Sequence, residues 1–204
     1  MTYRPIGAIK FLQELTMEDT KINKKKLFRF NKERALPFIL TGIIILADQI
    51  TKFIIVRNWP RPGTIIKDVF DNDFLRIVHV RNPTIAFSLG RNIPDSARPV
   101  LFIVVPLLVL GFLLWYYLKS NDFTRLQRWA TAGIIGGGIG NILDRIIRSE
   151  GVVDFIDIKI YGLFGLQRWP VFNIADSSVV VCCIILFVTI LFSSKKTKEI
   201  QRHE

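Results

Sequence analysis

Residues 100–118 read VLFIVVPLLVLGFLLWYYL and contain no charged side chain. As a helix, this run would rise about 28 Å, which is close to the ~30 Å hydrocarbon thickness of a lipid bilayer. Its residues leave no polar stripe at helical spacing, whereas a helix on the surface of a soluble protein carries one. The run therefore predicts a membrane-spanning helix.

Three further apolar runs have similar lengths, and they lie at 36–56, 129–147 and 172–192. Each contains ionisable residues, but none shows the polar stripe expected in the helices of a soluble domain. The sequence thus predicts an all-α membrane protein with four transmembrane helices. The membrane domain would cover 36–192, between a basic leader at 1–35 and a tail at 193–204.

The composition agrees with a chain whose apolar residues are grouped in membrane-spanning runs and whose basic residues lie mostly outside them. The 204 residues include 28 Lys and Arg against 17 Asp and Glu, a net charge of +11, yet half of the chain is hydrophobic. A soluble nucleic-acid-binding protein is seldom so apolar, and disordered chains are poor in the Ile, Leu, Phe and Val that dominate here. Nucleic acid is therefore not expected as a partner. The adjacent Cys182 and Cys183 give neither a disulfide framework nor the spacing of a metal site.

Basic residues are distributed unevenly around the four runs. Sixteen Lys and Arg lie in the 57 residues of 1–35, 119–128 and 193–204, against ten in the 67 residues of 57–99 and 148–171. Cytoplasmic segments of membrane proteins are enriched in positive charge. We therefore expect both termini in the cytoplasm and the two loops, 57–99 and 148–171, on the external side.

The external loops contain two stretches in which apolar residues alternate with others. They are 74–80 (FLRIVHV) and 155–161 (FIDIKIY). A period of two predicts short strands with one apolar face, hence a small extracytoplasmic β platform. His79 lies in the first stretch, and a lone histidine of this kind is interpreted as structural.

Charged residues within the apolar runs indicate function, because each costs at least ~2.5–3.5 kcal/mol to place in a membrane. The first run contains Asp48 and Lys52, the third Asp144 and Arg145, and the fourth Asp176. Asp48 and Lys52 are four residues apart, so an ion pair within one helix is expected. The long stem of Lys52 could also carry its ammonium towards the outer interface and the other aspartates.

Asp144 and Asp176 end the same pattern, Asn141 to Asp144 (NILD) and Asn173 to Asp176 (NIAD). One copy lies near the end of the third run and the other near the start of the fourth, so antiparallel helices would bring both to the external side. Each aspartate would lie about 5 Å inside its helix end. The sequence predicts two carboxylates at matching depth, each with an Asn three residues before it on the same face.

Two neighbouring carboxylates in a low dielectric do not both ionise cheaply, so one holds a proton. The charged one can take a proton from water while the other polarises a carbonyl, as in aspartic proteases. Two alternatives remain on the pattern alone: helix-end carboxylates that face lipid headgroups, and a proton or cation relay in a small transporter. Ala132, Gly136 and Gly140 form a face of small residues that would let the third helix pack closely.

Five motifs follow one another along the chain: DQITK (48–52), NPTIAFS (82–88), GGIGNILDR (137–145), VVDF (152–155) and WPVFNIAD (169–176). In their order and topology they resemble those of the bacterial lipoprotein signal peptidases (signal peptidase II). Members of this family are membrane aspartyl proteases that remove signal peptides from lipid-modified prolipoproteins. The resemblance covers about 36–192.

The resemblance implies roles for particular residues. Asp144 and Asp176 would be the catalytic pair. The residues that would line the substrate site are Asn82, Asn141, Arg145 and Asn173. Those that would support the site or touch the substrate are Asp48, Lys52 and Asp154.

The resemblance also implies a substrate and a location. The substrate would be a diacylglyceryl-cysteine prolipoprotein, cut just before the lipidated cysteine, with membrane lipids as the other partner. The enzyme would be a monomer that uses neither metal nor cofactor. It would lie in the bacterial cytoplasmic (inner) membrane, with its active site near the outer face.

The chain departs from the family pattern at two places. The family usually has a glycine two residues after the loop asparagine, and this chain has Thr84 there, preceded by Pro83. Glycine permits a positive φ or close backbone approach, so we expect an altered loop geometry beside Asn82. The leader 1–35 is also longer than usual, and its basic residues would either bind anionic lipid headgroups or form a solvated tail.

Overall fold

The computed structural model describes residues 32–83, 93–94 and 96–200, and in the last helix it describes side chains as far as residue 192. The chain forms two compact units, Met1–Ala35 and Leu36–Glu204. In the first unit the described part is α2 (Lys32–Ala35). The rest of the predicted leader, and Thr84 in the loop after Asn82, lie outside the described residues.

Each of the four apolar runs is helical in the second unit. The helices are α3 (Phe38–Asn58), η2 (Val100–Val104) continuing into α4 (Val105–Lys119), α5 (Arg125–Ile147) and α6 (Ile174–Ile200). Thr124 starts α5, because its hydroxyl accepts the backbone N–H of Gln127 while the Gln127 side chain accepts the N–H of Thr124. The helix therefore begins four residues before the apolar run, and α6 continues eight residues beyond its predicted end.

Within the residues that the structure describes, three helices are long and apolar enough to cross a membrane, and they contain α3, α4 and α6. Their outward side chains are large and apolar, as those of Phe112 on α4 and Phe187 on α6 show. These surfaces are suited to lipid, and the chain is a membrane-embedded protein. The remaining helix, α5, is rich in glycine and contains Asp144 and Arg145. That α5 is a fourth membrane-spanning helix stays a prediction.

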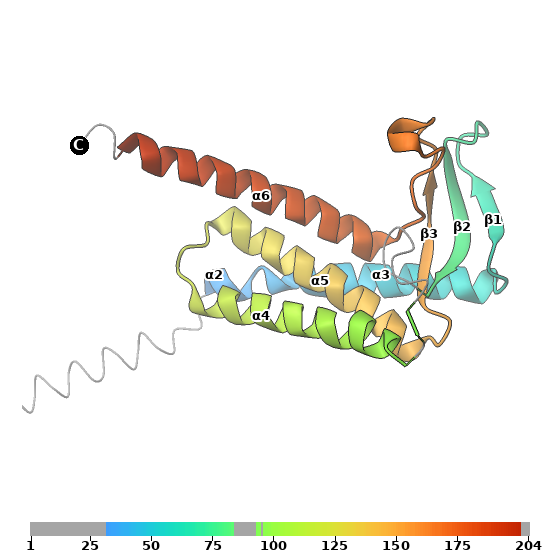
Figure 1. Cartoon of the computed structure of the whole chain (residues 1–204), viewed down its shortest axis with the longest axis horizontal. Helices are drawn as coiled ribbons and strands as arrows, with labels where there is room; N and C mark the ends of the chain where they lie inside the picture. The colour runs from blue at the N-terminus through green and yellow to red at the C-terminus, as the bar shows by residue number, and fades with distance from the viewer. Residues whose placement is uncertain (1–31, 84–92, 95, 201–204) are drawn as a thin grey trace, which may run out of the picture. The chain divides into compact units, whose positions relative to one another are not determined.

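Helix α5 packs between the other three because its glycines let them approach (Figure 1). A Cβ on Gly136 would lie 3.1 Å from the backbone of Thr41 on α3, and one on Gly138 would lie 2.8 Å from Leu110 on α4. A Cβ on Gly137 would collide with the Ala175 carbonyl oxygen on α6. The predicted close packing of this helix is confirmed.

A three-stranded antiparallel sheet stands at one end of the helices (Figure 1). Its strands, in spatial order, are β1 (Thr64–Asp68), β2 (Leu75–Asn82) and β3 (Val152–Ile158). The all-helical architecture with a small sheet is thus confirmed, and both predicted strands exist with shifted bounds. Strand β1 was not predicted, because Ile65 and Ile66 interrupt the alternation on which the prediction depended.

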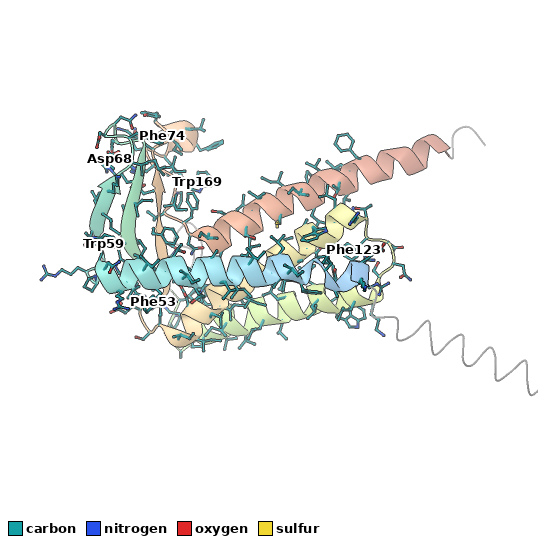
Figure 2. All side chains as sticks on the ribbon, turned by 180° about the vertical axis from the view of Figure 1, so that it is seen from behind. Phe53, Trp59, Asp68, Phe74, Phe123 and Trp169 are labelled. Atoms are coloured by element: carbon teal, nitrogen blue, oxygen red, sulfur yellow. The ribbon has the colours of Figure 1, made fainter. Side chains whose placement is uncertain are left out.

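The sheet packs on the end of α3 through a small apolar core. Ile55 of α3 and Val153 and Phe155 of β3 are buried together. His79 of β2 is also fully buried, and its Nδ1 lies 2.6 Å from the carbonyl oxygen of Trp59, just after α3. Figure 2 shows Trp59 at this sheet end of α3 and Phe123 at the opposite end of the helices. The contact is consistent with a structural role for His79.

The alternation in β3 does not separate an apolar face from a solvated one. Asp157 is buried, whereas Ile156 and Ile158 are half-buried. Arg168 explains the difference, because its Nε donates to Asp157 Oδ1 at 2.6 Å. The Asp157 side chain is therefore covered by its ion pair with Arg168 and does not face water.

Candidate active site

Helices α3, α5 and α6 meet strand β3 at the sheet end of the molecule, and polar side chains fill the junction. We call this set the polar cluster. Its members are Asp48, Gln49, Lys52, Asn82, Asn141, Asp144, Arg148, Asp154, Asn173 and Asp176.

Asp144 lies in the last turn of α5 and is fully buried. Its Oδ2 accepts the backbone N–H of Val153 at 3.0 Å and lies 3.1 Å from Lys52 Nζ. Its Oδ1 accepts the Gln49 side-chain amide at 3.0 Å and an N–H of Arg148. Both oxygens therefore have two partners each, and two of the four partners are cations.

Asp176 is placed by the start of α6. The Asn173 side chain accepts the backbone N–H of Asp176 at 2.9 Å, and Asp176 Oδ2 accepts the backbone N–H of Asn173 at 3.3 Å. These reciprocal bonds cap the helix and explain the spacing of NIAD. The other oxygen accepts the side-chain amide of Asn141 at 2.7 Å. Unlike Asp144, Asp176 is only half-buried.

Lys52 and Asn141 connect the two aspartates. The Lys52 ammonium lies 2.8 Å from Asp48 Oδ2, which confirms the predicted ion pair, and 3.0 Å from Asn141 Oδ1. The same ammonium contacts Asp144, and the Asn141 side-chain amide donates to Asp176. A chain of polar contacts therefore runs from one carboxylate to the other. The ammonium is fully buried, and it reaches Asp144, one of the aspartates towards which the Lys52 stem was expected to carry it.

Asp48 ties α3 to the start of α6. Its Oδ1 accepts the backbone N–H of Ala175 at 3.0 Å, one of the donors that a helix start leaves without a partner. A Cβ on Gly140 would lie 2.9 Å from the other Asp48 oxygen. Gly140 thus has a second function besides helix packing, which is to leave space for this carboxylate.

Asp154 of β3 lies beside Asp176. It accepts the side-chain amides of Asn82 at 2.9 Å and Asn173 at 2.7 Å. Burial, and to a lesser extent the charge of Asp176, raise the pKa of Asp154 to about 7, although the two amide hydrogen bonds and the charge of Lys52 act in the opposite direction. Asn82 approaches closely to Gly151, whose φ of +98° is a conformation that side chains rarely adopt.

Arg145 points away from Asp144, as its position next in sequence predicts. Its guanidinium carbon lies 6.0 Å from the centre of the Phe102 ring, and one N–H donates to the Asn141 carbonyl at 3.4 Å. It interacts electrostatically with Asp176 and Asp154. Arg145 therefore adds positive charge beside the polar cluster.

Two members of the polar cluster were not predicted from the sequence. The Gln49 amide nitrogen donates to Asp144 and to the Gly140 carbonyl, and its oxygen accepts an Arg148 N–H at 3.1 Å. Arg148 is four residues after Asp144, a spacing that puts both on one helix face and could have revealed the ion pair. Gln49 lies within the DQITK motif, but its partners on α5 are distant in sequence.

The arrangement can support acid–base chemistry. Asp144 is a buried carboxylate with cationic partners. Asp176, at the start of α6, is a half-buried carboxylate with amide partners. In residues 32–83, 93–94 and 96–200, no three His, Cys, Asp or Glu side chains are grouped in a way that could hold a metal ion.

Known proteins resemble this chain over most of its length. The family model for signal peptidase (SPase) II matches residues 40–192. The lipoprotein signal peptidase of Treponema denticola is 45% identical over 170 residues, which cover 83% of this chain and 96% of the relative. That of Treponema pallidum is 39% identical over 175 residues, covering 86% and 91%. That of Borrelia duttonii is 43% identical over 159 residues, covering 78% and 91%.

Solved structures show the same fold. A bacterial membrane enzyme determined by the in meso method at 2.3 Å resolution superposes with a TM-score of 0.67 at 26% identity, covering 79% of this chain and 91% of that one. A second one, at 1.9 Å, gives a TM-score of 0.65 at 27% identity, covering 77% and 93%. Since the family model spans most of the chain and the relatives align over nearly their whole length, this protein belongs to the signal peptidase II family.

Proposed function

We propose that this chain is a membrane aspartic endopeptidase that removes the signal peptide from diacylglyceryl-cysteine prolipoproteins, cutting before the lipidated cysteine. Membership of the signal peptidase II family supports proteolytic removal of signal peptides from prolipoproteins. The observation that carries the aspartic mechanism is the polar connection of Asp144 to Asp176 through Lys52 and Asn141.

In the proposed reaction, a water molecule between Asp144 and Asp176 attacks the scissile carbonyl carbon. One carboxylate takes a proton from the water as the new C–O bond forms, and the other gives its proton to the carbonyl oxygen. The resulting tetrahedral intermediate breaks its C–N bond, and the amine leaves with a proton from the pair. These proton transfers need only the two carboxylates, the water and the peptide.

The surroundings of the two carboxylates differ, and this supports different roles. Asp144 has Lys52 and Arg148 as partners, so we assign it as the base. Asp176 has the Asn141 side chain and the Asn173 backbone N–H as partners, and it is the more exposed carboxylate. We therefore assign Asp176 as the carboxylate that faces the peptide carbonyl and gives it a proton in the complex with substrate.

The other residues of the polar cluster would hold the pair and the peptide. Asn82, Asn141, Asn173 and Arg145 would line the substrate site. Asp48, Lys52 and Asp154 would support it, because their contacts join α3, β3 and the start of α6. The substrate's acyl chains would lie between helices, where each buried CH₂ adds ~0.8 kcal/mol of affinity.

We further propose a location and an assembly state. The uneven distribution of Lys and Arg supports a cytoplasmic position for both termini of the four-helix domain. The polar cluster would then lie near the outer face of the bacterial inner membrane, because the cluster and the sheet share one end of the helices (Figure 1). The enzyme would act as a monomer, since both proposed catalytic residues come from one chain.

The test is cleavage of a purified, lipidated prolipoprotein, followed by its gel shift. Asp144→Asn and Asp176→Asn should each abolish cleavage while the protein still inserts into membranes. Asp122→Asn is the matched control, because Asp122 is an exposed aspartate between α4 and α5 whose carboxylate contacts Ser120. Cleavage by either site variant at the control's rate would exclude the pair. Aspartate-dependent proton flux into liposomes, without cleavage, would instead support the relay.

A further inference from the structure

Four large apolar side chains project from the turn that follows β3. We call residues 161–166 the aromatic turn. Tyr161 is 66% exposed, Leu163 57%, Phe164 79% and Leu166 37%. The turn is a short 3₁₀ segment (Leu163–Gly165), and the part of the chain that the structure describes leaves its side chains largely uncovered.

The backbone of the aromatic turn adopts an uncommon conformation at two of these side chains. Tyr161 and Phe164 have φ values of 52° and 55°, a left-handed conformation that is uncommon for bulky residues. Backbone hydrogen bonds hold this conformation, since the Gly162 N–H donates to the Leu166 carbonyl oxygen at 3.0 Å and the Leu163 N–H donates to the Ile160 carbonyl oxygen at 3.0 Å. The exposed rings are therefore a fixed feature of the turn, held at a conformational cost.

Ion pairs hold the base of the aromatic turn against the neighbouring hairpin. Arg168 donates to Asp157 on β3 and, at 3.0 Å, to Asp73 before β2. Lys159 contacts the second Asp73 oxygen at 3.0 Å, and its ammonium lies 5.4 Å from the Tyr161 ring. Paired charges thus lie behind the turn while its tip is apolar. This combination of aromatic and basic residues is typical of membrane interfaces.

The position of the aromatic turn identifies its partner. In Figure 1 the orange segment between β3 and α6 lies on the helix side of the sheet, to one side of α6. Figure 2 shows Trp169 on this same side of the strands. The helices below carry exposed apolar residues such as Phe187 on α6, so the space around them is occupied by lipid. A turn on the helix side of the sheet would meet the surface of that lipid layer.

We propose that the aromatic turn inserts its apolar side chains into the lipid interface on the sheet side of the membrane. The lipid bilayer is the partner that covers these side chains, because the turn continues the apolar surface of the helices. Insertion fixes the height of the sheet, and therefore of Asp154 on β3, relative to the membrane. The inference concerns lipid contact and does not depend on the catalytic assignment.

The experiment measures collisions of a nitroxide spin label with oxygen, which concentrates in lipid, and with a water-soluble nickel chelate. The full chain carries Cys182→Ala and Cys183→Ala and is placed in phosphatidylcholine nanodiscs. The label is attached at Leu163→Cys or, in a second variant, at Phe164→Cys. Phe187→Cys on α6 provides the lipid reference, and Arg61→Cys, exposed between α3 and β1, provides the water reference.

The expected result is an oxygen-to-nickel collision ratio in the aromatic turn several-fold above that at residue 61 and approaching that at residue 187. A ratio equal to that at residue 61 would overturn the proposal, because the turn would then face water. Low collision rates with both reagents would also overturn it, since they would mean that protein, such as a second copy of the chain, covers the turn. Cleavage of a prolipoprotein by each labelled variant checks the fold independently.

Discussion

The Lys52 ammonium lies 3.1 Å from Asp144 Oδ2, and both side chains are fully buried. The two residues come from α3 and α5, so this ion pair joins helices as well as charges. Lys52 also neutralises Asp48, one turn earlier on its own helix. One cation therefore serves two buried carboxylates, and its loss would leave Asp48 without a cation and Asp144 with Arg148 alone.

Replacing Lys52 with methionine is expected to destabilise the protein and abolish cleavage. Methionine fills a similar volume but leaves Asp48 buried without a cation and Asp144 with Arg148 as its remaining cation. Breaking a buried pair in this way costs about 3–5 kcal/mol. The measurements are the apparent Tm in detergent and the rate of prolipoprotein cleavage. Equal Tm and rate in Lys52→Met and the parent would contradict the assignment.

The double variant Asp48→Asn/Lys52→Met serves as a control that separates folding from chemistry. Removal of the Asp48 charge together with the Lys52 charge should recover part of the lost Tm. Cleavage should not return, because Asp144 and Asn141 still lack the ammonium that connects them.

Replacing Arg148 with alanine is expected to lower kcat about tenfold and leave KM nearly unchanged. The guanidinium contacts Asp144 and, at 3.1 Å, the Gln49 side-chain oxygen, so it positions two members of the polar cluster. Hydrogen bonds to charged groups contribute about 1.5–3 kcal/mol, and a side chain that is 18% exposed belongs at the low end. About 1.4 kcal/mol corresponds to a tenfold change in rate.

Two further variants distinguish positioning from general loss of charge. Arg148→Lys should retain more activity than Arg148→Ala, because it keeps a cation beside Asp144. Arg57→Ala removes an exposed arginine at the end of α3 and should cleave at the parent rate. The same loss in Arg57→Ala and Arg148→Ala would show that Arg148 has no specific role.

The features that the sequence predicts well are those that depend on local spacing. The 100–118 run forms helix because its composition leaves no other arrangement in lipid, and Asp48 and Lys52 pair because one helical turn separates them. The second copy of the N-x-x-D pattern is local in the same sense, whereas Asn141 of the first copy donates to Asp176 on another helix. Asn173 and Asp176 cap each other at the start of α6, so the spacing follows from the helix end itself.

The features that the sequence did not predict depend on contacts between distant segments. Gln49 belongs to the polar cluster because α5 packs beside it, and no pattern within α3 indicates its partners. Asp157 is buried because Arg168 folds back over it from the next turn. The alternation in 155–161 predicts the strand, but it cannot say what covers each of its faces.

Replacing Gly140 with alanine is expected to reduce both stability and cleavage. The added Cβ would lie 2.9 Å from Asp48 Oδ2 and 3.2 Å from the Ala175 Cβ, so the Asp48 carboxylate must shift and α6 must give way slightly. Overpacking of this kind costs about 1–3 kcal/mol. Gly111→Ala on α4 is the matched control, because a Cβ there meets nothing within 4 Å. A similar Tm and cleavage rate for both variants would contradict the close approach at Gly140.

The pH dependence of stability is expected to report on Asp154. Its pKa is about 7 in the folded protein against an ordinary value of 3.8, so the folded chain keeps a proton that the unfolded chain loses as pH rises. The free energy of unfolding should therefore fall between about pH 4 and pH 7, by up to about 4 kcal/mol, and level off above pH 7. The measurement is the apparent Tm in detergent at pH 5 and pH 8.

Two variants assign this pH dependence to its causes. Asp154→Asn should lose most of the fall in Tm, because it has no proton to release at this position. Asp176→Asn should keep a smaller fall, because the charge of Asp176 is one of the two causes of the raised pKa and burial remains. The same decrease in Tm from pH 5 to pH 8 in the parent and in Asp154→Asn would mean that another group dominates.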